Sequence, residues 1–166
     1  MEDDAAVVAR QLGRPVRAFR RVALRCPFGR PAVTEQAPYD VEGDPFPTTY
    51  YLTCPHLVAG VSRLEASGGV ERWSARARTE PELAASLAAA TRDQRALRRR
   101  LAAGRYGSDG GSSLALGIAG AAKPEQLKCL HAHVAFALAR PGYRLGEEIL
   151  AEVDSPWPAA ACCTPE

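Results

Sequence analysis

Cysteine and histidine residues gather in three short motifs of this 166-residue chain. Cys26 and Cys54 each stand directly before a proline, and a third motif runs from Cys129 to His133 with His131 at its centre. Thiol and imidazole side chains can bind a soft metal ion, or can serve as nucleophile and base in covalent catalysis. These motifs therefore mark the part of the chain in which chemistry is expected.

The proline after each cysteine is typical of the first position of a helix, which would place the cysteine at the N-cap. Free main-chain N–H groups and the helix dipole stabilise a thiolate there. Cys54 fits this pattern better than Cys26, because a helix is predicted over 55–66. Leu57 occupies the position that would complete a C-x-x-C motif, so a dithiol redox centre of that type is excluded. The alternative is that both cysteines are small buried residues at strand ends.

The third motif lies in an apolar segment that predicts a helix over 124–140. On such a helix Cys129 and His133 fall one turn apart on the same face, a spacing that metal-binding side chains use. His131 falls on the face of the leucines, which indicates a packed, hydrogen-bonded histidine. Polar groups such as Lys128 and Cys129 are costly on a buried helix unless they are paired. This motif is the strongest functional signal in the sequence.

A metal site would have to be assembled from distant segments, because no spacing matches a zinc ribbon or zinc finger. Several thiolates together favour zinc or an iron–sulfur cluster over a hard ion. The expected ligands are Cys26, Cys54 and Cys129, with a fourth from Cys162, Cys163 or His133.

Two other hypotheses remain open. In the first, the protein is a cysteine-dependent enzyme with Cys54 or Cys129 as nucleophile, aided by Lys128 or by a histidine such as His131, His56 or His133. The glycine-rich segment 104–122 would then act as a lid. In the second, the protein is a non-catalytic interaction module that uses the arginine-rich helix predicted over 80–103. Aromatic residues are not interleaved with these arginines, so a nucleic-acid partner is not expected.

Strand patterns come early in the chain and helix patterns late. The predicted strands are 19–25, 31–38 and 48–53, and the main predicted helices are 3–13, 55–66, 80–103, 124–140 and 145–153. This order predicts an α+β fold, with a small N-terminal antiparallel sheet of about three strands packed by four to five helices. In an antiparallel meander the first and third strands run in the same direction, so Cys26 and Cys54 would leave the same edge, about 10 Å apart across one strand or about half that if the two strands pair directly. Only the closer arrangement would let both sulfurs bind one metal easily.

Composition favours one folded domain, because 46% of the residues are apolar and 24% are charged. We assign residues 1–153 to this domain and residues 154–166 to a proline-rich tail that carries Cys162 and Cys163. The net charge of +2 creates no strong field toward nucleic acid or anionic lipid. No secretory signal or membrane-spanning stretch is recognised, so a cytoplasmic location is expected. Clustered cysteines there indicate metal or thiol chemistry rather than disulfides.

Four segments in combination resemble the DUF501 family, found mainly in actinobacteria. They are RCPFG at 25–29, PFPTTYYLTCP at 45–55, RLEASG at 63–68 and KCLH at 128–131. The resemblance runs from Leu12 to about Glu148, and it implies a fold-sized unit and a site without an assigned reaction. It also implies less weight for His133 as a required ligand and more for Cys26, Cys54 and Cys129.

Overall fold

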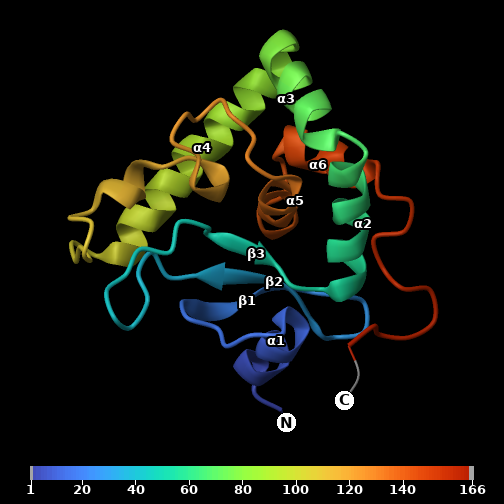
Figure 1. The fold of residues 1–166 in the computed structure, drawn as a ribbon, viewed down its shortest axis with the longest axis horizontal. Coiled ribbons are helices and arrows are strands. Elements are labelled where there is room, and N and C mark those ends of the chain that lie inside the picture. Colours follow the sequence, from blue (N-terminus) through green and yellow to red (C-terminus); the bar gives the residue numbers. More distant parts are fainter. Residues whose placement is uncertain (1, 165–166) are drawn as a thin grey trace.

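The computed structural model describes residues 2–164 and shows an antiparallel sheet with helices on both of its faces (Figure 1). The α+β fold predicted from the sequence is confirmed. The strands are β1 (Phe19–Arg25), β2 (Pro31–Gln36) and β3 (Tyr50–Leu52); the helices are α1 (Asp4–Leu12), α2 (Pro55–Ala66), α3 (Gly69–Thr79), α4 (Pro81–Ala102), α5 (Leu130–Ala139) and α6 (Arg144–Ala151), with short 3-10 helices η1 (Ser112–Ala115) and η2 (Ile118–Gly120).

The sheet has the order β1-β2-β3, and both strand pairs are antiparallel. Val33 of the central strand lies opposite Leu24 on one side and Leu52 on the other. Every residue of β2 is buried, because α1 lies on one face of the sheet and α5 on the other. Strands β1 and β3 run in the same direction, so Cys26 and Cys54 leave the sheet at the same end, as predicted.

Helix α5 lies at the centre of the fold and is apolar on nearly all sides. Figure 1 shows it end-on above the sheet, with α2, α4 and α6 around it. Phe136 packs edge-to-face on Tyr50 of β3 at 5.4 Å and on Tyr143, at the start of α6, at 5.5 Å between ring centroids. These contacts connect the sheet to the helical layer, so any group on α5 has a fixed position relative to the sheet.

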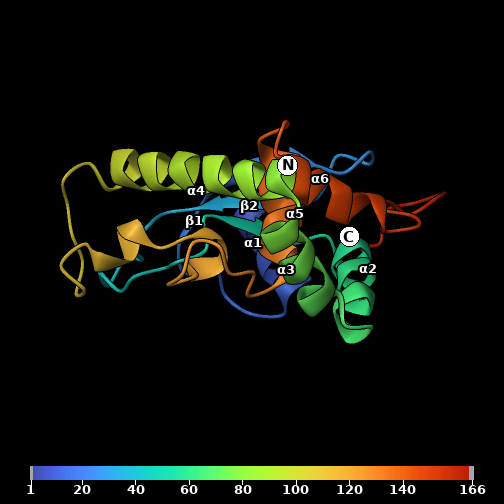
Figure 2. The ribbon, with the colours of Figure 1, turned by 90° about the horizontal axis from the view of Figure 1, so that it is seen from above.

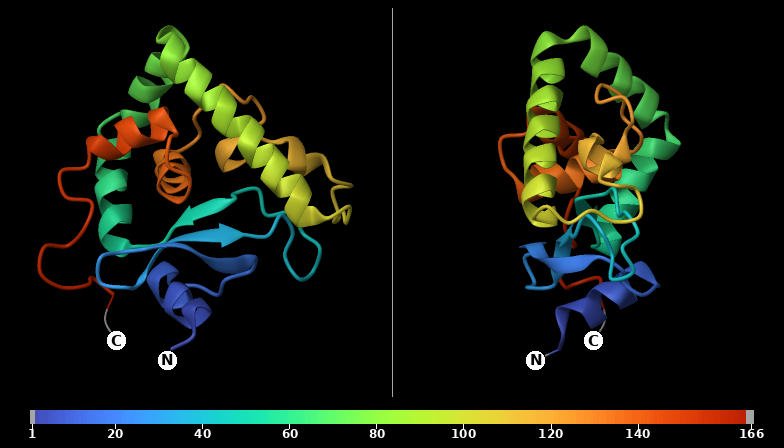
Figure 3. Two further views of the ribbon diagram at one scale, coloured as in Figure 1. Left: turned by 180° about the vertical axis from the view of Figure 1, so that it is seen from behind. Right: turned by 90° about the vertical axis from the view of Figure 1, so that its left-hand side faces the viewer.

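Helices α2, α3 and α4 form an arch over α5 and α6 (Figure 3). Helix α3 was not predicted; Gly68, with φ of 83°, ends α2, but a new helix begins at the next residue. Pro81 cannot donate a main-chain hydrogen bond and so separates α3 from α4. The N-cap of α4 is Glu80, and the hydroxyl of Thr79 before it donates to the Ala75 carbonyl at 3.0 Å.

Helix α5 begins at Leu130, six residues later than predicted from the sequence. The Leu130 N–H donates to the Glu65 carboxylate of α2 at 2.7 Å, which satisfies a free donor at this helix end. Cys129 is the N-cap, with an extended backbone (φ −152°). The helical spacing predicted for Cys129 and His133 is therefore wrong, because Cys129 stands outside the helix.

The tail after α6 contains neither helix nor strand in its described part, which ends at residue 164. It runs along the outside of α2 and returns to the first turn of that helix (Figure 1), on the opposite side of the molecule from the 104–122 segment (Figure 2). The Nε2 atom of His56 is hydrogen-bonded to the Ser155 carbonyl oxygen at 2.7 Å, and the Gln11 side-chain amide donates to the Thr164 hydroxyl at 3.0 Å. No helix in residues 2–164 is long and apolar enough to cross a membrane.

Candidate functional site

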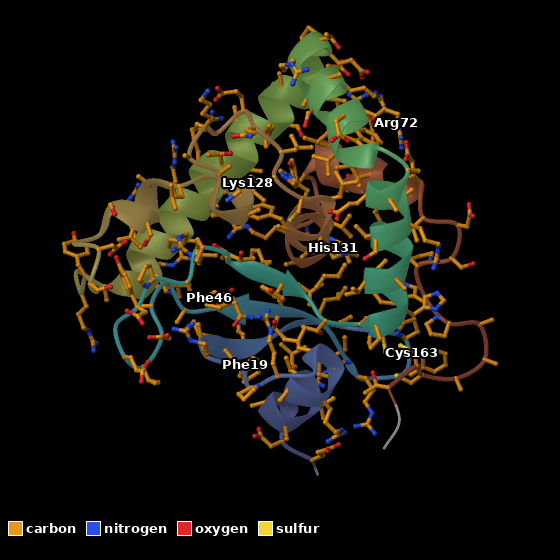
Figure 4. The ribbon with its side chains drawn as sticks, in the orientation of Figure 1. Phe19, Phe46, Arg72, Lys128, His131 and Cys163 are labelled. Carbon is orange, nitrogen blue, oxygen red and sulfur yellow. The ribbon has the colours of Figure 1, made fainter. Side chains whose placement is uncertain are left out.

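Four of the five cysteines lie at the end of the sheet where β1 and β3 stop. Cys26 follows β1, Cys54 follows β3, and the returning tail brings Cys162 and Cys163 to them. The Sγ atoms of Cys54 and Cys163 are 3.7 Å apart, and all five cysteines are free thiols. Figure 4 shows Cys163 beside the first turn of α2. We call these four residues the cysteine group.

Cys26 occupies the tight turn between β1 and β2. Its N–H donates to the Arg30 carbonyl at 2.8 Å, and its own carbonyl accepts from Gly29 at 2.9 Å. Gly29 has φ of 82°, a left-handed conformation that glycine adopts without a Cβ clash. No helix follows Pro27, so the helix N-cap predicted for Cys26 is wrong. A β-hairpin turn holds this buried thiol instead.

Cys54 is the N-cap of α2 with Pro55 at the first helical position, as predicted. Burial, however, raises the pKa of Cys54 to about 11, and the neighbouring Cys163 thiol acts in the same direction. The nearby N–H groups of Leu57 and His56 lower the pKa, but neither makes a capping hydrogen bond to the sulfur. Without a bound cation Cys54 is a thiol at neutral pH, which does not support its role as an activated nucleophile.

The pKa of Cys162 is shifted in the opposite direction to that of Cys54. Burial disfavours its ionisation, but the Thr164 N–H, 3.4 Å from its sulfur, lowers the pKa. The Cys26 thiol and the positive charge of Arg30 lower it further, so the pKa of Cys162 is below its ordinary value. Cys163 is in direct contact with Cys54, whereas Cys26 affects Cys162 only as a nearby thiol that lowers its pKa.

Cys129 does not join the cysteine group. Within residues 2–164 only Asp40, Glu42 and Asp44 form a set of three or more ligand atoms that all lie within 4.8 Å of one another. The predicted convergence of Cys26, Cys54 and Cys129 is therefore not found, and no three sulfurs of the cysteine group lie that close together either in this part of the chain. Burial raises the pKa of the Cys129 thiol, and the Glu65 carboxylate raises it further. Its partner in the catalytic hypothesis, Lys128, is exposed to solvent.

Asp40, Glu42 and Asp44 form an acidic set in the turn before β3, and the contacts of Asp40 stabilise this turn. Asp40 accepts from the main-chain N–H groups of Glu42 and Asp44, each at 3.0 Å. Arg17 pairs with Asp40 and lies 3.6 Å from Asp44, so part of the negative charge is already neutralised. Asp40 holds the turn as an Asx-type cap would.

Both histidines of α5 are packed and hydrogen-bonded, as predicted for His131 but not for His133. His133 is fully buried; its Nδ1 lies 2.7 Å from the Tyr143 hydroxyl, and burial lowers its pKa to about 4. His133 therefore packs against the α6 side and does not reach the cysteine group. The ring of His131 faces α2, with Nδ1 at 3.1 Å from Glu65 and Nε2 at 3.1 Å from the Ser62 hydroxyl. Both of its nitrogens are occupied, so His131 is a structural link and not a free base.

The arginine-rich helix α4 uses part of its charge inside the protein. Arg98 is fully buried and donates to the Phe46 carbonyl at 2.9 Å, and burial lowers its pKa. Arg95 donates to the Ala115 carbonyl at 2.8 Å, which attaches the 104–122 segment to α4. This segment does not line the pocket beside Cys129, described below, so it is not a lid over that site. Arg92, Arg99 and Arg100 remain exposed.

A pocket of about 620 Å³ lies beside Cys129, between the end of α1, strand β3, helix α2 and the first turn of α5. We call it the Cys129 pocket. Arg14 and Thr53 line it, and neither was a candidate in the sequence. No sequence signal could have identified them, because four segments that are far apart in the chain form its wall.

The family model described as "Protein of unknown function (DUF501)" matches residues 22–151. The chain belongs to the DUF501 family. No curated protein and no solved structure matches it. The match includes Cys26, Cys54 and Cys129, whereas Cys162 and Cys163 of this DUF501 protein lie beyond its last residue.

Glu65 gives a first testable prediction, because it fixes the start of α5. Its carboxylate accepts from Leu130 N–H and contacts His131, which joins α2 to α5. Replacement by alanine should lower the free energy of unfolding by about 2 kcal/mol, the cost of losing a helix cap and a charge-assisted hydrogen bond. Urea denaturation measures this change. Glu125→Ala, at an exposed position nearby, is the matched control, and an equal effect of both variants would contradict the assignment.

Proposed function

We propose that this DUF501 protein binds a zinc ion through the cysteine group, with Cys26, Cys54, Cys162 and Cys163 as ligands. The observation that carries the proposal is the 3.7 Å distance between the Cys54 and Cys163 sulfurs. A tetrahedral site with Zn–S bonds of about 2.3 Å has sulfurs about 3.8 Å apart. A pair of thiols at this separation, from residues 109 positions apart in the chain, supports one edge of such a site.

The path of the tail supports the same site. Residues 154–164 have no regular structure to hold them, yet they return to the sheet and bring two adjacent cysteines to two different strand ends. Cys163 contacts Cys54, and the nearby Cys26 thiol helps to lower the pKa of Cys162. No three of the four sulfurs lie within 4.8 Å of one another in the described residues, so metal binding would draw the tail inward. The free energy of metal binding would then stabilise the folded tail.

The donor set favours zinc as the ion. Four sulfur ligands exclude magnesium and calcium, which prefer oxygen. In a [4Fe–4S] cluster each cysteine binds a different iron atom, so the cysteine sulfurs stand further apart than two ligands of one ion. Four protein ligands leave no open position for substrate, so the site would be structural. Zinc would also stabilise the Cys54 thiolate, which burial alone disfavours. Five free thiols fit a reducing, cytoplasmic location.

Metal analysis of the purified protein tests this proposal. We expect about one zinc ion per chain by mass spectrometry of elements, and loss of most of it in the variant Cys54→Ser/Cys163→Ser. Cys129→Ser is the matched control, because this cysteine lies outside the group, and it should keep its zinc. Substitution with cobalt should give the visible absorption of a tetrahedral thiolate site. A metal-free protein, or equal zinc loss in the control, would overturn the proposal.

A further inference from the structure

The Cys129 pocket has the size and the wall of a small-molecule site. Its volume of about 620 Å³ lies within the range of about 300–1,000 Å³ that is typical of ligand pockets. Most of the wall is apolar or aromatic, including Leu12, Tyr51, Leu52, Val58 and Ala132. These residues come from α1, β3, α2 and α5, which the core holds in place. The pocket is therefore preformed, and it is separate from the cysteine group.

The wall carries one permanent positive charge. The guanidinium of Arg14 donates to the Tyr51 hydroxyl at 2.6 Å and lies over the Tyr51 ring, 5.7 Å from its centroid. This contact holds Arg14 at the pocket, but no ion pair joins it to a carboxylate in the described chain. No aspartate or glutamate lines the pocket, and Glu65 nearby is bound to Leu130 and His131. An anion at Arg14 would meet an uncompensated charge.

A buried hydroxyl in the same wall lacks a partner. Thr53 lines the pocket and is 1% exposed, and its Oγ1 has no hydrogen-bond partner in the described chain. The Oε1 atom of Gln11, another wall residue, is also buried and unpaired. Buried polar atoms without partners are uncommon and cost about 1–3 kcal/mol each. A ligand oxygen could satisfy Thr53, whose hydroxyl can donate as well as accept.

We propose that the Cys129 pocket binds a small organic anion with an apolar body. Its carboxylate or phosphate group binds Arg14 and Thr53, and its hydrocarbon chain or aromatic ring packs on Tyr51, Leu52 and Val58. Cys129 lies in the wall, so the rate at which its thiol is alkylated reports whether the pocket holds a ligand. Because none of these residues belongs to the cysteine group, the pocket binds its ligand whether or not the protein holds zinc.

Two pairs of probes test the charge and the body of the ligand separately. The aliphatic pair is decanoate, which carries a carboxylate, and decanol, which is neutral. The aromatic pair is 1-naphthoate, which carries a carboxylate, and 1-naphthamide, which is neutral. Saturation-transfer NMR and calorimetry measure binding to the full chain. We expect at least one anion to bind, and to bind about tenfold more tightly than its neutral counterpart, the scale of one charge-assisted hydrogen bond. The anion that binds better identifies the body as aliphatic or aromatic.

Alkylation of Cys129 locates the probe. N-ethylmaleimide modification followed by peptide mass spectrometry should show Cys129 protected about fivefold or more by the bound anion, relative to the same protein without the anion. Ala59→Phe, at an exposed wall position, should block the pocket and abolish both binding and protection. Arg14→Gln should remove the preference for the anion, while Arg92→Gln, which removes an exposed charge on α4, should change nothing.

Several results would overturn this proposal. They are the absence of binding by all four probes, equal affinity for anions and neutral counterparts, and binding that Ala59→Phe leaves intact. Circular dichroism of each variant confirms that it is folded. Metal content is measured on the same samples, so a protein that lacks zinc but binds an anion, or the reverse, separates this proposal from the zinc site.

Discussion

Replacing Gly146 by alanine is expected to lower the free energy of unfolding by about 3 kcal/mol or more. Gly146 lies in α6 where that helix crosses α5 most closely. A Cβ atom there would lie 2.5 Å from the His133 carbonyl oxygen and 2.7 Å from the Ala137 Cβ. Both atoms belong to the backbone or to a side chain that cannot rotate away, so the helices would have to separate. Overpacking of this kind costs about 1–3 kcal/mol, and more where backbone atoms clash.

Gly60→Ala is the matched control for this prediction. A Cβ at Gly60 of α2 would also be close to a neighbour, 2.9 Å from Cγ1 of Val153, but Val153 lies after the end of α6, in a segment that can shift more easily than two packed helices. Alanine also stabilises a helix interior relative to glycine by about 1 kcal/mol, which offsets the contact. Urea denaturation of both variants compares them. Equal destabilisation would show that α5 and α6 can separate more easily than their packing indicates.

Acidification is expected to destabilise the protein through His133. Burial lowers the pKa of His133 to about 4 in the folded protein, against about 6.5 in an unfolded chain. The unfolded state therefore binds a proton more readily between these values. The stabilisation by neutral His133 is complete above pH 6.5 and is lost as the pH falls to 4. The shift corresponds to about 3 kcal/mol over this interval.

The free energy of unfolding, measured by urea titration between pH 4.5 and pH 7, tests this expectation. The wild-type protein should lose most of the stabilisation by neutral His133 as the pH falls through this range. In His133→Leu the free energy of unfolding should depend much less on pH. Tyr143→Phe removes the hydroxyl that His133 contacts but not the burial, so it should lower stability at each pH and keep the slope. The carboxylates Glu2 and Glu80, with lowered pKa values, titrate below this window. An unchanged slope in His133→Leu would assign the acid sensitivity to another group.

His133 also explains why the predicted site differs from the observed one. The sequence placed His133 beside Cys129 because a continuous helix from residue 124 was assumed. The helix begins at Leu130, where the Glu65 carboxylate from α2 binds its first N–H. A side chain 65 residues away decides this boundary, and no local pattern contains that information. The change places His133 against Tyr143 in the core and leaves Cys129 facing the pocket.

Local patterns were sufficient where short-range chemistry decides the structure. The segments predicted as strands, 19–25, 31–38 and 48–53, contain the three observed strands. Cys54 and Pro55 form the N-cap and the first residue of α2, as predicted. The same dipeptide failed at Cys26, because a β-hairpin turn and not a helix follows it. Helix α3 was also missed: the Gly68-Gly69 pair indicates a break, but a chain that turns by one left-handed residue can start a new helix at once.

The sequence by itself determined the α+β class, the family, and the positions of Cys26 and Cys54 at the ends of two strands. It also identified the tail cysteines as possible ligands, but it gave no means of ranking them against Cys129 and His133. Only the tertiary structure decided that the tail returns to Cys26 and Cys54 while Cys129 lines a separate pocket. The physical reason is that secondary structure depends mostly on neighbours along the chain. A thiol pair or a pocket wall depends on which distant surfaces the buried core brings together.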